Sequence, residues 1–287
     1  MVESGGYKLR VGTSQGSPGS LPLLVFNGIG ANLELLRGFA DEMERYGVGV
    51  ITFDVPGVGG SSLAIVPYRI PHLARVANRL LGTLGISGQV DVAGVSWGGA
   101  LAQEFTHRFP RRVRRLVLAA TTAGTFALPG RWSALSKMIG PRRYGDPAYM
   151  RRIAGELYGG KLRDDPALVE QYGKLLRPPK GLGYFYQLFA ASGWTSVLWL
   201  PRLRQQTLVM MGTEDPIVPV VNGRLLAALI PNARLWTIPD GHLFLLTSRR
   251  ECAQAIVDFL NHGAWPQERL PARDLVAPRR LRTPAET

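Results

Sequence analysis

The stretch Val90-Asp-Val-Ala-Gly-Val-Ser-Trp-Gly-Gly-Ala-Leu-Ala-Gln103 decides the fold of this 287-residue chain. Its apolar start predicts a buried strand over 90–95, and the pattern after it predicts a helix over 100–109. Between them, Gly94-Val-Ser96-Trp-Gly98 matches G-x-S-x-G, which requires a strand before it and a helix after it. Such a turn lifts a serine hydroxyl above the sheet, so we predict Ser96 as a nucleophile. The alternative is an ordinary turn with a capping serine.

Strand-like and helix-like segments alternate on both sides of this stretch. Strands that are apolar along their whole length and alternate with helices belong to a parallel sheet that is covered on both faces. We therefore predict the α/β class, with a doubly wound and mostly parallel sheet. Further strands are expected over 21–26, 48–53, 113–120, 207–211 and 235–238, and helices over 33–46, 71–84, 219–229 and 248–260.

The alternation stops between residues 123 and 206. This segment holds 12 of the 25 aromatic residues and 13 Lys or Arg against 5 Asp or Glu, and it contains no strand-like run. We predict a helical cap there, inserted into a core formed by residues 1–122 and 207–262. Residues 263–287 are rich in Pro and Arg without an apolar period, so we expect a loose tail.

Composition sets the broad class of the protein. Hydrophobic residues make up 46% of the chain, which excludes a disordered protein. The net charge of +13 could indicate nucleic acid or an anionic surface as a partner, or only a coding preference for Arg. No nucleic-acid recognition motif accompanies it. With a lone cysteine, Cys252, no signal-like N-terminus and no long apolar window, we expect a cytoplasmic protein without a membrane span.

A serine hydroxyl is a weak nucleophile without a base, and the chain offers four histidines. His242 alone follows a predicted strand, at the edge where doubly wound sheets place their sites. His72, His107 and His262 lie at the start, inside and at the end of predicted helices. We therefore predict His242 as the base.

A carboxylate should orient the imidazole, and the expected chain order is serine, acid, histidine. Asp215 follows one predicted strand and precedes a helix, so it is the predicted acid. Glu214 on the same turn and Asp240 near His242 are the alternatives. Asp54 is interpreted as a residue that holds a turn.

Two backbone N–H groups should stabilise the oxyanion that such a nucleophile creates. We predict those of Trp97 and of Ile29, the latter in the glycine-rich turn Asn27-Gly28-Ile29-Gly30. A turn of this kind could also hold a phosphate, but the nucleotide pattern G-x-G-x-x-G is missing. No cluster has metal-ligand spacing, so we expect neither a cofactor nor a metal.

At this level of detail the chain resembles the α/β-hydrolases of the intracellular poly(3-hydroxyalkanoate) depolymerase family, which act on medium-chain-length storage polyesters. The resemblance spans residues 21 to about 260 and is most specific in FNGIGANLEL and GWTS. It implies a triad of Ser96, Asp215 and His242. The matching segments are Phe26–Leu35, Phe53–Ser62, Gly94–Gln103, Gln187–Ala190, Gly193–Ser196 and Asp240–Leu245.

The resemblance implies a serine hydrolase that cleaves the ester bonds of this polyester and releases 3-hydroxyalkanoic acid monomers or oligomers. The granule surface is the candidate partner, and neither nucleic acid nor an integral membrane is expected. One rival is a small-molecule carboxylesterase or cofactor-free perhydrolase of the same fold, and another is a non-catalytic granule-surface binding protein. The candidate substrate-binding residues are Asn27, Gly28, Tyr184, Phe189, Trp194 and Trp199, although the aromatic residues could equally form the core of the cap.

Overall fold

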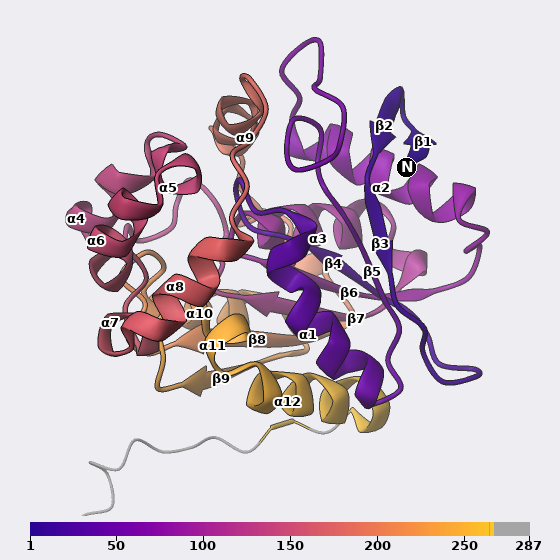
Figure 1. Cartoon of the computed structure of the whole chain (residues 1–287). Helices are drawn as coiled ribbons and strands as arrows, with labels where there is room; N and C mark the ends of the chain where they lie inside the picture. Colours follow the sequence, from indigo (N-terminus) through magenta and orange to yellow (C-terminus); the bar gives the residue numbers. More distant parts are fainter. Residues whose placement is uncertain (264, 267–287) are drawn as a thin grey trace, which may run out of the picture.

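The computed structural model describes residues 1–263, 265 and 266. Its centre is a seven-stranded sheet with the strand order β3-β5-β4-β6-β7-β8-β9 (Figure 1). β3 pairs antiparallel with β5, and every other neighbouring pair is parallel, which confirms the predicted α/β class. The strands are β3 (Val11–Thr13), β4 (Leu23–Phe26), β5 (Val50–Phe53), β6 (Val90–Val95), β7 (Val113–Ala119), β8 (Gln206–Gly212) and β9 (Ala233–Ile238).

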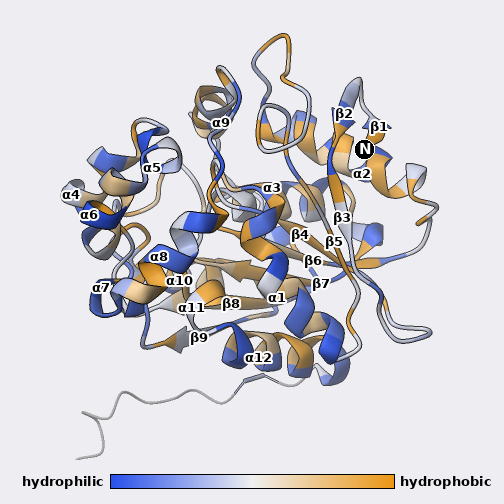
Figure 2. Ribbon diagram, in the orientation of Figure 1, coloured by the Kyte–Doolittle hydropathy of each residue, from blue (hydrophilic) through white to orange (hydrophobic). Residues whose placement is uncertain are grey.

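Helices cover both faces of this sheet. In β4, Leu24 and Phe26 belong to one buried cluster and Leu23 and Val25 to the other, because successive residues of a strand point to opposite faces. In Figure 2 the strands are mostly hydrophobic in colour, whereas the covering helices also carry hydrophilic residues. The first face packs against α2 (Ile70–Thr83), α3 (Trp97–Arg108) and α10 (Val220–Leu229), and the second against α1 (Leu33–Arg45), α11 (Phe244–Thr247) and α12 (Arg249–His262).

The N-terminal strands are absent from the sequence-based prediction. β1 (Val2–Ser4) and β2 (Tyr7–Leu9) form a separate antiparallel pair, and β3 is the edge of the main sheet. Each has only three residues and mixes polar with apolar side chains, so none forms the apolar run on which the prediction depends. β1 also packs on α2, where the Ser4 hydroxyl donates a hydrogen bond to the Val76 carbonyl.

Residues 120–205, here called the inserted segment, join β7 to β8. All of them are described, and none belongs to a strand of the sheet. The division of the chain into core and cap stays a prediction, and the predicted tail lies outside the described residues except at its first positions. The α-helices of the segment are α4 (Trp132–Leu135), α5 (Arg142–Gly145), α6 (Pro147–Tyr158), α7 (Lys161–Asp164), α8 (Pro166–Leu175) and α9 (Gly183–Ala191).

In Figure 1 the helices α4 to α8 gather beside the β8 end of the sheet, and α9 stands apart from them near the loop before α2. Hydrogen bonds hold the segment before α9 against the loop before α2. Lys180 donates its backbone N–H to the Gly57 carbonyl and its ammonium group to the Ser61 carbonyl. Among the described helices, none combines the length and the apolar character needed to cross a bilayer.

Candidate active site

Ser96 occupies a strained turn between β6 and α3. Its φ of 53° and ψ of −120° lie in a region that non-glycine residues rarely adopt. The turn is held because the Ser96 N–H donates to the Ala119 carbonyl at 2.9 Å and the Thr121 hydroxyl donates to the Ser96 carbonyl at 2.7 Å. α3 begins at Trp97, three residues earlier than predicted, since the turn leads directly into the helix.

The motif has glycine at positions 94 and 98 because neighbouring backbone atoms lie too close for a side chain there. Neither Gly94 nor Gly98 has a positive φ. A Cβ on Gly94 would overlap the Gly98 carbonyl oxygen, and one on Gly98 would overlap the carbonyl oxygen of Phe26. Side chains at these two positions would therefore push α3 away from β6 and β4 and displace the serine turn.

Asp215 and His242 lie on the loops that follow β8 and β9, and both are buried. Asp215 Oδ2 is 2.7 Å from His242 Nδ1. The other carboxylate oxygen, Oδ1, accepts the backbone N–H groups of Ile217 and Val218 at 2.8 and 2.9 Å. The carboxylate is thus fixed by its own loop with one oxygen directed at the imidazole, which is the arrangement that selects one tautomer of a base.

The two alternative acids are engaged elsewhere. Glu214 forms an ion pair with Arg163 at 2.7 Å on the exposed side of the turn. Asp240 Oδ1 accepts the backbone N–H groups of Lys161 and Gly241, while its Oδ2 accepts the hydroxyl groups of Thr247 and Ser248. Asp215 is therefore the one of the three candidates whose carboxylate contacts the His242 ring.

Two other histidines lie in structural contacts away from Ser96. His72 Nε2 is 3.1 Å from the Tyr7 hydroxyl, and its pKa is lowered by burial and by the nearby Arg75. His107 is stacked on Trp199 with the ring centroids 4.3 Å apart.

Ser96 and His242 line the same pocket, together with Asn27, Gly28 and Ile29. Apart from these groups the wall is mainly apolar, and its aromatic part comes from the inserted segment. An apolar pocket with a few convergent polar groups is typical of a site for a small or chain-like organic ligand. The remaining lining residues are Ala31, Leu35, Leu36, Val95, Met138, Tyr144, Tyr158, Tyr172, Leu243, Leu245 and Leu246.

The predicted aromatic substrate-binding residues do not line this pocket. Tyr184 is fully buried, and Phe189 lies under the Arg69 guanidinium group, 3.9 Å from the ring centroid. Trp194 donates its indole N–H to Glu104, and Trp199 packs on α3 through His107. The aromatic residues that line the pocket are instead Tyr144, Tyr158 and Tyr172. Sequence reasoning missed these tyrosines because composition identifies an aromatic-rich segment without indicating which side chains turn inward.

Of the two residues predicted to donate to the oxyanion, Ile29 lines this pocket, and Trp97 directly follows Ser96, which also lines it. In the turn after β4, the Gly28 N–H donates to Asn27 Oδ1 at 2.9 Å and the Gly30 N–H donates to Gln187 Oε1 at 2.7 Å. Within the described chain, the backbone N–H groups of Ile29 and Trp97 make no hydrogen bond. That of Trp97 is also at the N-terminus of α3, where the helix dipole favours negative charge.

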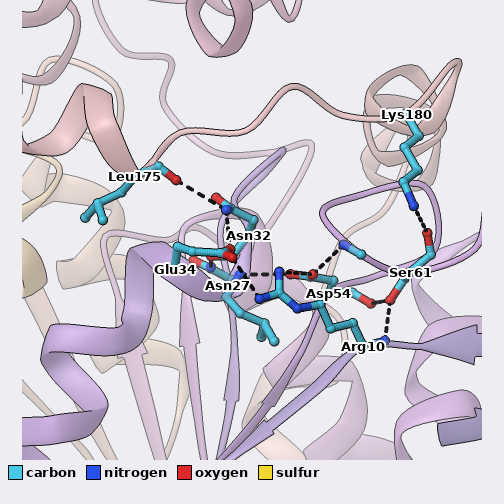
Figure 3. Close-up of polar contacts among 10 residues, drawn as sticks. Arg10, Asn27, Asn32, Glu34, Asp54, Ser61, Leu175 and Lys180 are labelled. Carbon is cyan, nitrogen blue, oxygen red and sulfur yellow. Dashed lines mark hydrogen bonds and ion pairs between the residues drawn. The ribbon is translucent and has the colours of Figure 1, made fainter. Parts of the chain in front are cut away.

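A polar network joins this turn to the neighbouring loops (Figure 3). Asn27 Nδ2 donates to the Asn32 carbonyl at 2.9 Å. Asp54, which is buried, accepts the N–H of Leu33 at the start of α1 and the N–H of Gly60, both at 2.8 Å. The pKa of Asp54 is raised by burial, partly offset by these bonds and by Arg10. Asp54 thus holds more than its own turn, since it ties two loops together.

Comparisons with known proteins agree with this fold. The chain matches the family described as alpha/beta hydrolase fold over residues 22–248, and it therefore belongs to the α/β-hydrolase family. Within that family it is 50% identical, over 259 residues, to a poly(3-hydroxyalkanoate) depolymerase of Ectopseudomonas oleovorans, with 90% of this chain and 91% of that protein covered. This confirms the resemblance found in the sequence.

More distant relatives share the fold. A 3-oxoadipate enol-lactonase 2 of Acinetobacter baylyi is 29% identical over 225 residues, which cover 77% of this chain and 82% of that protein. The crystal structure of the enol-lactonase from Burkholderia xenovorans LB400 superposes with a TM-score of 0.77 at 22% identity, covering 90% of this chain and 98% of that one.

Proposed function

We propose that this protein is a serine hydrolase that cleaves the ester bonds of medium-chain-length poly(3-hydroxyalkanoate) and releases 3-hydroxyalkanoic acid monomers or oligomers. The observation that carries the proposal is the 50% identity, over nine tenths of the chain, to a poly(3-hydroxyalkanoate) depolymerase. The apolar pocket around Ser96 and His242 supports it, because such a polyester presents apolar side chains beside each ester.

The geometry supports a two-step mechanism. His242 Nε2 takes the proton of Ser96 as the hydroxyl oxygen attacks the ester carbonyl, while Asp215 stabilises the imidazolium that forms. The N–H groups of Ile29 and Trp97 hold the oxyanion, and His242 then gives its proton to the leaving hydroxyl group of the polymer. Water, deprotonated by His242, attacks the acyl-serine ester and frees the 3-hydroxy acid with regeneration of Ser96.

The inserted segment would act as the cap of this site. Three of its tyrosines line the pocket, and the Tyr158 carbonyl accepts the backbone N–H of His242 at 2.7 Å. The Tyr158 ring also stacks on the imidazole, with the centroids 6.4 Å apart and the planes 14° from parallel. In this proposal the segment both shapes the acyl pocket and restrains the base.

The same proposal places the protein on the surface of cytoplasmic polyester granules. Exposed apolar side chains gather on α9 and on the loop before α2, which hydrogen bonds from Lys180 join together. A water-insoluble polyester offers an apolar surface to such a patch. We define the apolar patch as Leu63, Ile65, Val66, Leu182, Phe185 and Phe189, whose side chains are all exposed.

The test is clearing of a medium-chain-length poly(3-hydroxyalkanoate) latex by the purified protein, with polyhydroxybutyrate latex and p-nitrophenyl octanoate beside it and Ser96→Ala as the control. We expect clearing of the first latex, and its loss in the variant. Hydrolysis of the soluble ester alone would replace the polymer with the small-molecule carboxylesterase alternative. Latex binding without any hydrolysis would favour the non-catalytic granule protein.

A further inference from the structure

The peptide group between Ile29 and Gly30 is bound on both sides by the inserted segment. Its carbonyl oxygen accepts a hydrogen bond from the Tyr144 hydroxyl, and its N–H donates to Gln187 Oε1 at 2.7 Å. Tyr144 lies on α5 and Gln187 on α9, so two separate helices hold this one peptide plane. The next peptide group towards the N-terminus carries the Ile29 N–H, which is one of the two predicted oxyanion donors.

Gln187 also contacts the side chain of Trp97, the residue whose backbone N–H is the second predicted donor. Its backbone carbonyl accepts the indole N–H of Trp97 at 2.9 Å, and the Trp97 side chain is buried in this contact. A single residue of the inserted segment is therefore hydrogen-bonded to the turn that contains Ile29 and to Trp97. Since Gln187 is itself 1% exposed, both bonds lie out of reach of solvent.

The surroundings of Tyr144 fit a positioning role. Gly30 has a φ of +67°, and a Cβ on it would lie 2.6 Å from the Tyr144 ring, so glycine is needed for the ring to approach the turn. Arg143 Nη2 lies 3.2 Å from the Tyr144 hydroxyl and can donate to it. Arg143 is 1% exposed, and its guanidinium group lies over the rings of Tyr144 and Tyr184. The hydroxyl therefore accepts from Arg143 and donates its own proton to the Ile29 carbonyl.

We propose that Gln187 and Tyr144 are positioning residues for the oxyanion hole, through which the inserted segment sets the orientation of the Ile29 and Trp97 N–H groups. The inference rests on the proposed function only in taking Ser96 as the nucleophile. Oxyanion stabilisation depends on donor placement, because misplacement by about 1 Å can lower a rate by about 100-fold. Loss of either contact lets the turn relax and weakens transition-state binding more than ground-state binding.

The experiment compares Gln187→Met and Tyr144→Phe with two matched controls on p-nitrophenyl octanoate. Gln187→Met keeps side-chain length but removes the acceptor, and Tyr144→Phe removes only the hydroxyl. Ser196→Ala removes another buried hydrogen bond between the inserted segment and the core, that to Gln103. Tyr68→Phe removes the hydroxyl of a buried tyrosine that donates to the Pro56 carbonyl. Either test variant suffices if the other fails to fold.

Each test variant is expected to lower kcat by about 10- to 100-fold while KM stays within about threefold. The affinity for an alkylboronic acid, whose tetrahedral adduct with Ser96 places an oxygen in the oxyanion hole, should fall in parallel with kcat. Both controls should keep kcat and boronate affinity within about threefold.

An unchanged kcat in the folded test variants, an unchanged boronate affinity, or an equal loss in the controls would overturn the proposal. Failure of the one part of the proposed function on which this inference rests, Ser96 as the nucleophile, would look different, because Ser96→Ala would then hydrolyse the soluble ester as fast as the parent protein.

Discussion

At the scale of single residues, the two carboxylate oxygens of Asp215 have different partners, and this difference allows its role as the acid of the triad to be tested. Oδ1 is bound by the backbone of its own loop, and only Oδ2 faces His242. Asp215→Asn should keep the loop but favour the wrong imidazole tautomer, lowering kcat/KM by about 10⁴-fold. Glu214→Gln, which breaks only the ion pair with Arg163, should leave kcat/KM within about threefold. Ester hydrolysis kinetics on both variants would decide, and the reverse ranking would make Glu214 the acid.

The backbone of Ser96 predicts a stability gain at the cost of activity. Its φ of 53° suits glycine far better than alanine or serine. We expect Ser96→Gly and Ser96→Ala both to lose hydrolysis, and Ser96→Gly to be the more stable of the two by about 1 kcal/mol. Urea unfolding measures this difference, with equal m values as the check that the comparison is sound. Equal stability of the two variants would show that the turn stores no strain.

The position of a residue in the fold can be predicted from sequence where two independent signals fall on that residue. Ser96, Asp215 and His242 each carry a chemical signal, and each follows an apolar run, so their common location at one sheet edge could be foreseen. Gln187 and Tyr144 have neither a catalytic motif around them nor a predicted strand directly before them in the sequence. Their importance depends on which way two short helices face, and an aromatic-rich composition does not determine that.

At the scale of elements, the loops around the turn after β4 depend on a small charge network (Figure 3). Arg10 is 2.7 Å from Glu34 and 3.6 Å from Asp54. The hydrogen bond from Arg10 lowers the pKa of Glu34 below its usual value of 4.5, whereas burial raises that of Asp54 above 3.8. Arg10 thus stabilises the fold only while these carboxylates are charged.

A pH dependence follows from these directions. A carboxylate with a lowered folded pKa contributes stability above its unfolded pKa and loses it as the pH falls through the folded value. The Arg10–Glu34 contribution should therefore be complete at neutral pH and decline below about pH 4.5. We expect Arg10→Gln to lower the free energy of unfolding by about 1 kcal/mol at pH 7. The loss should be clearly smaller at pH 3.5, as measured by urea unfolding at both values. A loss that is equal at the two pH values would assign the effect to packing of the Arg10 stem.

Element prediction from sequence worked for β4 to β9 because each contains a mainly apolar stretch between breakers. It failed for β1 to β3, whose three-residue strands gain their stability from pairing and from contact with α2. It also placed no individual helix in the inserted segment. Half of the α-helices there, α4, α5 and α7, have four residues each, too few to display a period.

At the scale of the whole molecule, the apolar patch predicts a difference between soluble and particulate substrates. Leu182 and Phe185 are 54% and 45% exposed, and neither lines the pocket. Leu182→Ser with Phe185→Ser should lower the rate of latex clearing severalfold and leave hydrolysis of p-nitrophenyl octanoate unchanged. Trp132→Ser is the matched control, since Trp132 is 75% exposed on α4 outside the patch. Equal clearing by the two variants would exclude the patch as the docking surface.

The positive charge of the chain could also hold it on the polyester surface. The salt dependence of binding distinguishes this electrostatic docking from docking through the apolar patch. The net charge of the chain is +13, and Lys and Arg outnumber Asp and Glu in the predicted cap. Attraction between exposed charges weakens once the Debye length falls from about 14 Å to about 4 Å, that is, from about 50 mM to about 500 mM salt. Apolar contact does not weaken under those conditions. If the patch docks the enzyme, latex association measured by sedimentation should survive the higher salt in the parent protein and be lost in the double variant at both salt levels. Association that disappears with salt, and is insensitive to the double substitution, would assign docking to the basic residues instead.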